Sequence, residues 1–381
     1  MTTNSLNTTV SDSILSLRSP DALIAAVPYL LGFVPSESLV IVWLSKNQLR
    51  LTLRVDLPPA GYTGQHRELS QVIAGAAANA GADEVVILIF TDEPRATQLP
   101  FSTLITTLLV DFFGLGIRVR DALMIAAGTE AAGPGISAKW WSYLGAESDI
   151  ESPGCALDEQ IALYVKSRFT LEGVAALADR GDLERSFDPD TDRSQRVGLL
   201  VKGFAKALAK NQGYAEGEGQ MTAITAWRDK SIEKVVTLVV AAEGREPSDS
   251  DIARLVFCLS DIRVRDTLLW HLVQLPDHRA ALDVLAVALR AAPAGMIAPV
   301  ATCTSICAWL TGDGARALIA LERAQLADPE YSLAALVAQG LVAGLPPVFW
   351  ISAMAGVTEE QCRTGESPAG LATRSAVDCY D

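Results

Sequence analysis

Carboxylates that follow predicted strands are the side chains in this sequence best placed for acid–base chemistry. Asp92 and Glu93 follow the apolar run 85–90, and Glu130 follows a second run that reaches Ala127. Ligands of open sheets gather at the carboxyl ends of strands, and a carboxylate whose pKa is shifted by burial could act there as an acid, a base or a cation ligand. Asp92, Glu93 and Glu130 are therefore the candidate catalytic residues. The alternative interpretation is that they are polar residues of the kind that ordinarily begin the loop after a strand.

Four other side chains are candidates for binding a ligand. Asp56 closes another predicted strand, so it is expected at the same edge of the sheet. Tyr29 lies in the segment PYLLGF, and Trp140 and Tyr143 lie in the segment WWSY. Their alternative role is structural.

Three aspartates, Asp188, Asp190 and Asp192, have the spacing of the first ligands of a calcium loop. Such a loop also needs a glycine for its sharp turn and a closing glutamate. Arg193 stands at the glycine position and Leu199 at the glutamate position. The segment therefore favours an acidic helix start over a calcium site.

Cys303 and Cys307 lie four residues apart, which places both thiols on one face of a helix. Two thiolates make only half of a zinc site, and no CxxC pair or nearby histidine completes it, so we predict buried core cysteines. The sequence also lacks the phosphate-binding glycine loop, the dinucleotide fingerprint, the nucleophile elbow and the metalloprotease helix. We expect no metal and no cofactor.

The elements that would position the strand-end residues fill the first domain, predicted at 1–150. Ser19-Pro20-Asp21 marks a helix start, and a strand at 39–44 pairs with the alternating strand 49–57 as an antiparallel hairpin. Buried strands separated by helix-length segments indicate βαβ crossovers, hence an α/β domain with a mixed sheet and helices packed on it. Its further expected elements are a helix at 65–79, a strand at 85–90, a helix at 104–113, a strand at 117–127 and an edge strand at 140–144.

The second predicted domain, 151–381, is all-α. Ala317, Leu321 and Ala324 have the spacing of one helix of a tetratricopeptide-like repeat. The pattern does not recur one period earlier, so we predict an irregular, helical-repeat-like array, with a mobile loop at 211–219. The expected helices are 195–210, 223–242, 251–259, 265–275, 280–291 and four shorter ones between 296 and 354.

The composition excludes some classes of protein and disfavours others. The chain has 31 Lys and Arg against 45 Asp and Glu, a formal net charge of −14, and 50% hydrophobic residues. That hydrophobic content excludes a mainly disordered chain. A protein that binds the phosphate backbone of a nucleic acid needs an excess of basic residues, so nucleic acid is the least favoured partner.

The sequence also predicts a cytoplasmic location. Six cysteines are too few for a disulfide framework, and the first twenty residues lack a secretory signal. Two uncharged stretches, 291–312 and 331–358, are long enough to span a bilayer. Both contain prolines and glycines that would leave backbone groups unpaired in lipid, so we interpret them as buried helices and expect no membrane association.

Several segments resemble an uncharacterised actinobacterial family, domain of unknown function 4192. These segments are PYLLGF at 28–33, RVDLP at 54–58, Arg265-Asp266, GDGA at 312–315 and DPEYSL at 328–333. The resemblance covers most of the chain and implies no established activity. Members of that family carry a cysteine-rich stretch after the tryptophan segment, whereas here Cys155 stands alone. This departure argues against a thiol or metal role.

Two classes of function remain open. The first is a non-enzymatic cytoplasmic adaptor or regulator whose helical domain binds a protein partner. The helix-rich second domain and the lack of a complete catalytic motif in the sequence favour it. The second is a small-molecule or nucleotide-binding enzyme with its site at the carboxyl ends of the N-terminal strands, which would use the strand-end carboxylates.

Overall fold

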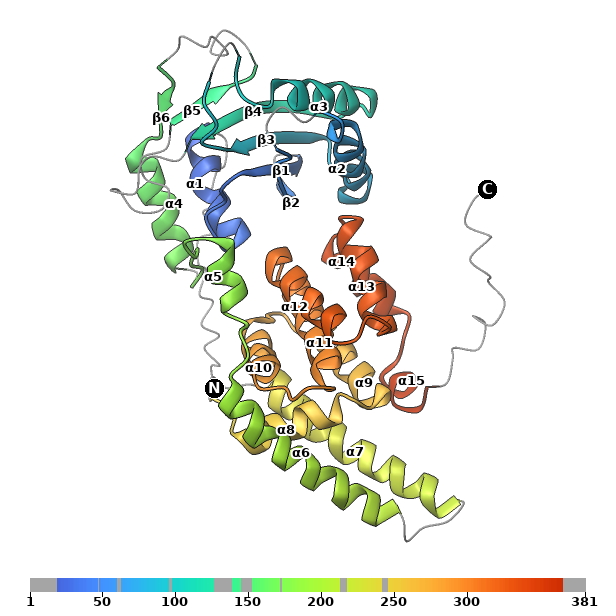
Figure 1. Cartoon of the computed structure of the whole chain (residues 1–381). Coiled ribbons are helices and arrows are strands. Elements are labelled where there is room, and N and C mark those ends of the chain that lie inside the picture. The colour runs from blue at the N-terminus through green and yellow to red at the C-terminus, as the bar shows by residue number, and fades with distance from the viewer. Residues whose placement is uncertain are drawn as a thin grey trace, which may run out of the picture. The chain divides into compact units, whose positions relative to one another are not determined.

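The computed structural model confirms the predicted fold class, an N-terminal mixed sheet with helices followed by a mostly helical region (Figure 1). Two compact units divide the chain. The first is formed by residues up to 70 and by 83–180, and the second by residues 71–82 and by those from 181 onward. The structure describes residues 19–46, 48–59, 63–95, 98–126, 139–144, 153–171, 173–212, 218–241 and 246–365.

The first unit is built on a six-stranded sheet with the order β2-β1-β3-β4-β5-β6. The strands are β1 Ser38–Ser45, β2 Gln48–Asp56, β3 Glu84–Phe90, β4 Arg118–Ala126, β5 Lys139–Ser142 and β6 Cys155–Ala156. All neighbours are antiparallel except β3 and β4, which are parallel. The predicted hairpin is β1–β2, and β5 lies one place in from the edge because β6 pairs beyond it.

Burial explains why these sequences form strands. Every residue of β1 and of β3 is buried, which accounts for their continuous apolar runs. Helix α3 (Ser102–Gly114) provides the crossover between β3 and β4. Its Phe112 packs edge-on against Trp43 of β1, with the ring centroids 5.3 Å apart.

The last residues of β2, β3 and β4 lie together with the first residue of β1 at one side of the sheet, which we call the strand-end edge. Ser38, the first residue of β1, pairs with Asp56 at the end of β2 and with Phe90 at the end of β3. At the same edge Ala126, the last residue of β4, pairs with Lys139 at the start of β5. The last residues of β2, β3 and β4 therefore lie side by side at this edge.

Helix α1 (Pro20–Leu31) begins where the sequence predicts. The Ser19 hydroxyl accepts a hydrogen bond from the amide of Ala22, and Gly32 ends the helix in the left-handed conformation, with φ 78°. Ala22 and Ala26 form a small core with Val165 of α4 (Glu159–Leu171). Helix α2 (His66–Ala80) corresponds to the helix predicted at 65–79.

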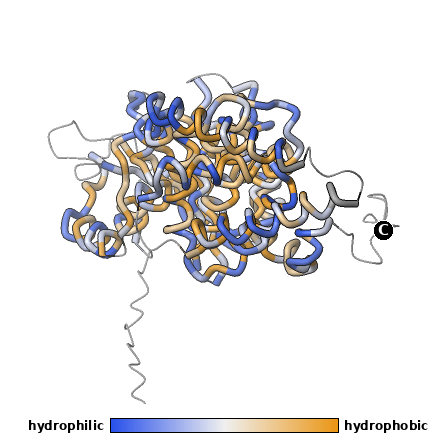
Figure 2. The backbone as a smooth tube through the Cα atoms, turned by 90° about the horizontal axis from the view of Figure 1, so that it is seen from below, coloured by the Kyte–Doolittle hydropathy of each residue, from blue (hydrophilic) through white to orange (hydrophobic). Residues whose placement is uncertain are grey.

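The structure forms the helices predicted for the second unit and adds α5 and α15. The interpretation of 331–358 as buried helices is wrong for α14 (Pro347–Ala355), which has no buried residue. Figure 2 shows hydrophobic and hydrophilic segments alternating along the chain, as helices with one buried face require. Most residues of α11 are buried, which explains one of the two uncharged stretches, and no described helix is long and apolar enough to cross a membrane. Of the mobile loop predicted at 211–219, residues 213–217 lie outside the described residues. The helices are α5 Arg180–Arg185, α6 Thr191–Gln212, α7 Glu218–Val240, α8 Asp249–Cys258, α9 Ile262–Val273, α10 Arg279–Arg290, α11 Ile297–Leu310, α12 Gly314–Ala327, α13 Ser332–Val342, α14 Pro347–Ala355 and α15 Glu359–Thr364.

Candidate functional site

Glu37 organises the strand-end edge of the first unit. One carboxylate oxygen accepts a hydrogen bond from the Thr91 hydroxyl at 2.8 Å, and the other accepts one from the amide of Asp92 at 3.0 Å. The Thr91 hydroxyl in turn accepts the amide of Glu93 at 3.1 Å. Glu37 has φ 42°, in the left-handed region that glutamate rarely adopts. The segment that follows β3 is thus fixed by a strained acidic residue that precedes β1.

A second polar group occupies the same edge on β2. The Arg54 guanidinium donates to the Ser38 hydroxyl at 2.9 Å and pairs with Asp56 at 2.6 Å. It also lies over the Phe33 ring, 5.9 Å from its centroid. The Asp56 side chain is 77% exposed, so it reaches solvent beside this arginine.

Of the three predicted catalytic residues, the structure describes only Asp92 and Glu93. Asp92 is exposed and Glu93 half-buried, and both follow β3 directly. Glu130 lies outside the described residues. Two grooves are formed elsewhere, and neither is lined by Asp92 or Glu93.

The aromatic binding candidates make structural contacts. The Tyr29 ring stacks on Phe169 with centroids 4.8 Å apart, and burial raises the pKa of its hydroxyl. The Trp140 indole N–H donates to Asp21 at 3.2 Å. The hydroxyl of Tyr143 donates to the carbonyl of Pro100 at 2.6 Å, and burial raises its pKa.

The segment with the spacing of a calcium loop forms an ion pair and a helix cap instead. Asp188 pairs with Arg323 at 3.1 Å, while Asp190 accepts the amide of Arg193 at 2.9 Å at the start of α6. Among the described residues no cluster of three or more His, Cys, Asp or Glu could hold a metal ion.

Cys303 and Cys307 are buried in α11, as predicted. Burial raises the pKa of each thiol to about 12, so both are protonated at neutral pH. None of the five described cysteines forms a disulfide bond. The two α11 thiols belong to the helical core.

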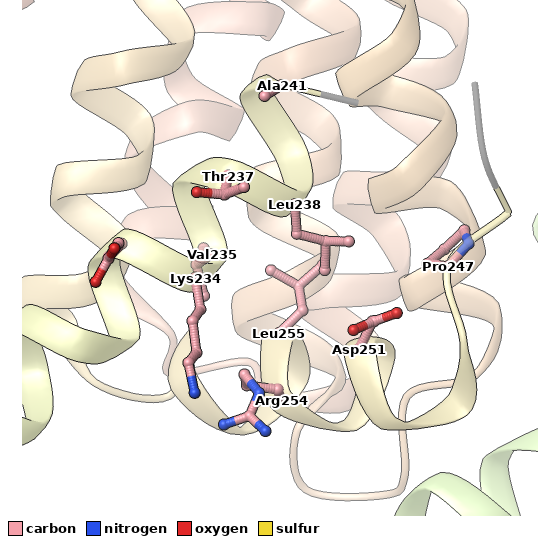
Figure 3. Close-up of a pocket in the computed structure, with 10 residues that line it drawn as sticks. Lys234, Val235, Thr237, Leu238, Ala241, Pro247, Asp251, Arg254 and Leu255 are labelled. Carbon is pink, nitrogen blue, oxygen red and sulfur yellow. The ribbon is translucent and has the colours of Figure 1, made fainter. Parts of the chain in front are cut away.

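A groove of about 780 Å³ lies between α7 and α8 in the helical unit (Figure 3). The side chains of Leu238 and Leu255 approach each other from the two helices (Figure 3). Val235, Pro247 and Leu255 are buried, whereas Glu233, Lys234 and Thr237 are exposed. The groove thus has an apolar floor and a polar rim. Its lining residues are Glu233, Lys234, Val235, Thr237, Leu238, Ala241, Pro247, Asp251, Arg254 and Leu255.

Two features hold the α8 wall of this groove in place. Ser248 and Asp251 form a reciprocal capping box at the start of α8. Arg254 lies over the Phe204 ring of α6, 4.9 Å from its centroid, which restricts the guanidinium at the rim.

Arg193 of α6 anchors the chain that leads into α8. It donates to Asp249 and Glu246, each at 2.9 Å, and to the carbonyl of Pro247 at 2.5 Å. Since Pro247 lines the groove, this guanidinium fixes one end of the groove from a helix more than fifty residues earlier in the chain.

A second groove, of about 480 Å³, lies along α3 and the start of α2. Two of its hydroxyl groups are bonded within α3, since Thr106 donates to the carbonyl of Ser102 and Thr107 to that of Thr103. Asp111 accepts the Ser70 hydroxyl at 2.5 Å. The polar atoms here stabilise the helices.

The sequence interpretation missed Glu37 and the α7–α8 groove. Glu37 stands between Pro35 and a strand without any motif, and only its spatial neighbours reveal its role. For the groove, the sequence predicts both helices, at 223–242 and 251–259, but not that they face each other. A short connection between two predicted helices was the available signal.

Comparison with known proteins gives one match. The family model described as Domain of unknown function (DUF4192) matches residues 20–348. No curated protein and no solved structure matches the chain.

Proposed function

Because the chain belongs to the family described as a domain of unknown function (DUF4192), whose description carries no activity, we propose a function from its own geometry: a non-enzymatic adaptor or regulator. In this proposal the helical unit binds a protein partner in the α7–α8 groove. The single observation that carries it is the groove itself, with its apolar floor and charged rim.

The chemistry of the groove favours an amphipathic helix of a partner protein. Apolar side chains from one face of such a helix would cover Leu238 and Leu255, and removal of that surface from water would drive binding. Exposed Glu233 and Lys234 stand next to each other on α7, so the rim offers both signs of charge. A partner helix with mixed charges beside its apolar stripe fits this rim better than a uniformly acidic or basic one.

The test uses two variants of the same helix. Thr237 is exposed and lines the groove, while Ala226 is exposed on α7 without lining it. Thr237→Arg places a long side chain over the floor, and Ala226→Arg makes a comparable surface change elsewhere. The bait is the full chain, captured from native cytosol together with its bound proteins.

We expect one protein to be recovered in stoichiometric amount with the wild type and with Ala226→Arg, and to be lost with Thr237→Arg. Equal melting temperatures of the three baits would show that the loss is local. The proposal fails if no protein is recovered stoichiometrically, or if Thr237→Arg recovers it unchanged.

A second candidate function is a small-molecule or nucleotide-binding enzyme with its site at the strand ends. The positive φ of Glu37 favours it, because strained residues concentrate at functional sites. Asp92 and Glu93 would then serve as acid, base or cation ligand.

A thermal-shift screen with nucleotides, metal ions and metabolites discriminates the two functions. A ligand at 100 times its Kd adds about 2.7 kcal/mol to the free energy of unfolding. A ligand that shifts the wild type but not Asp92→Asn would favour the enzyme, and a screen without shifts would favour the adaptor.

The proposal also places the protein in the cytoplasm of an actinobacterium. The five described cysteines form no disulfide bond, which supports an intracellular location, since stable disulfides belong to oxidising compartments. Fractionation of the native host, followed by immunodetection, tests the location.

A further inference from the structure

Helix α14 is apolar on every side, and yet none of its residues is buried. Its sequence, PVFWISAMA, contains no charged side chain. Val348 is 58% exposed, Phe349 54% and Ile351 38%. A helix that is hydrophobic all round is ordinarily buried, either in a protein core or in lipid. The described part of the chain thus leaves α14 without the cover that such a helix normally has.

One narrow side of α14 attaches it to the helical unit. Pro347, Trp350 and Met354 are half-buried, and their spacing of three and four residues places them on the same side of the helix. The Trp350 ring packs against Trp309 of α11, with the ring centroids 6.3 Å apart. All other residues of α14 are exposed. The helix is therefore held on one side and open to a partner on the others.

The exposed residues of α13 extend this surface. Only residues 343–346 separate the two helices, and Leu336 and Val342 of α13 are 56% and 68% exposed. No charged residue occurs between Glu330 and Glu359, although charged residues make up 20% of the chain. We call the exposed residues of the two helices the uncharged surface. They are Ser332, Ala335, Leu336, Gln339, Val342, Val348, Phe349, Ile351, Ser352, Ala353 and Ala355.

We propose that the uncharged surface is the contact between two copies of this chain, with α14 at its centre. Interfaces between identical subunits are more apolar than those of transient partners, and charged residues are depleted from their cores. The α7–α8 groove, with both signs of charge at its rim, differs from this surface in kind. Phe349 is the exposed aromatic residue of α14 and is the anchor that we expect at the centre of the contact.

The net charge of the chain favours self-association through this surface. Each copy carries a formal charge of −14, so two copies repel each other wherever their acidic residues come close. Contact between two uncharged surfaces places no like charges directly opposite each other. A lipid bilayer fits less well, because helices that lie on membranes carry Lys and Arg beside their apolar face. The charged residues that flank this stretch are instead Glu330, Glu359 and Glu360.

Sedimentation equilibrium of the full chain tests the proposal. The mass of the wild type is expected to rise with concentration from 40.5 kDa toward twice that value. Phe349→Asp brings a carboxylate from each copy into the contact and should weaken dimerisation about tenfold or more. Val348→Asp makes the same change at a second exposed position and should act alike. Leu199→Asp is the matched control: Leu199 is 70% exposed on α6, and its variant should dimerise as the wild type does.

Salt provides a second measurement. Sodium chloride screens the repulsion between two acidic copies, and the proposed contact contains no ion pairs that salt could weaken. Added salt should therefore strengthen the dimer, whereas an interface built on ion pairs would dissociate. Equal melting temperatures of the variants and the wild type would show that the substitutions leave the fold intact.

Four outcomes would overturn the proposal. The wild type could be monomeric at every concentration, as it would be if another part of the same chain covered α14. Both α14 variants could dimerise as the wild type does, or added salt could dissociate the dimer. Finally, a monomeric wild type could float with phosphatidylcholine vesicles while Phe349→Asp does not, which would assign α14 to lipid.

Discussion

Glu37 accepts a hydrogen bond from the buried hydroxyl of Thr91 at 2.8 Å, across 54 positions of sequence. The bond joins the residue that precedes β1 to the residue that follows β3, and these strands are neighbours in the sheet. Glu37 holds a left-handed backbone to make it. Conformational strain at this position is therefore offset by side-chain hydrogen bonds.

Replacing Glu37 should separate the strain from the hydrogen bonds. Glu37→Ala loses both carboxylate bonds and keeps the strain, so it should lower the free energy of unfolding by about 1–2 kcal/mol. Glu37→Gly also loses the bonds but relieves the strain, and should be more stable than Glu37→Ala by about 1 kcal/mol. Chemical denaturation measures both. Equal stability of the two variants would show that the left-handed backbone of Glu37 is not strained.

Gly154 should tolerate no side chain. Its φ is 75°, and a Cβ atom there would overlap the indole ring of Trp141. Gly154→Ala should therefore destabilise the first unit by more than about 2 kcal/mol, through both strain and displacement of the ring. Gly116 has a similar φ of 72° with open space around it. Gly116→Ala is the matched control and should cost only about 1 kcal/mol, with tryptophan fluorescence following the unfolding.

Arg193 should contribute far more to the helical unit than its neighbour Arg196. The Arg193 side chain is 14% exposed and binds three partners, whereas Arg196 is 58% exposed and pairs, among the described residues, with Asp249. Arg193→Lys cannot reproduce the forked set of bonds and should lower the free energy of unfolding by about 2 kcal/mol. Arg196→Lys should leave the thermal unfolding curve nearly unchanged. Similar curves for the two variants would contradict this hierarchy.

The Asp277 carboxyl should titrate at unusually low pH. Hydrogen bonds from the side chain and amide of Arg279 lower its pKa to about 2, below the ordinary value of 3.8. A lowered carboxyl pKa stabilises the folded state above pH 3.8, and the contribution is lost as pH falls toward 2. Carboxyl NMR should give a midpoint near 2 for the wild type and a higher one for Arg279→Gln. An unchanged midpoint in the variant would show that Arg279 does not set the pKa.

The thiols of α11 should be unreactive while the protein is folded. Both Cys303 and Cys307 are buried with pKa values of about 12, whereas Cys155 is half-buried. Alkylation at about pH 8 followed by peptide mass spectrometry should label Cys155 before the two α11 cysteines, which should react only after denaturation. Rapid labelling of Cys303 in the folded protein would contradict its place in the core.

Local patterns were sufficient to predict most elements. Ser19-Pro20-Asp21 predicted the start of α1, and the alternation from Leu49 to Leu57 predicted β2. The helices of the second unit followed from helix-length segments between glycine and proline breakers. These signals work because capping and side-chain periodicity depend on residues within one turn of helix or a few residues of strand.

The sequence did not predict which residues of different elements contact each other. Strand order decided that Glu37 meets Thr91, because β1 and β3 are neighbours in the sheet. The groove exists because α7 and α8 face each other. The sequence by itself determined the elements and the fold class, because local propensity and burial pattern are written in neighbouring residues. Only the tertiary structure decided which side chains meet, because contacts between residues fifty or more positions apart depend on how all the elements pack together.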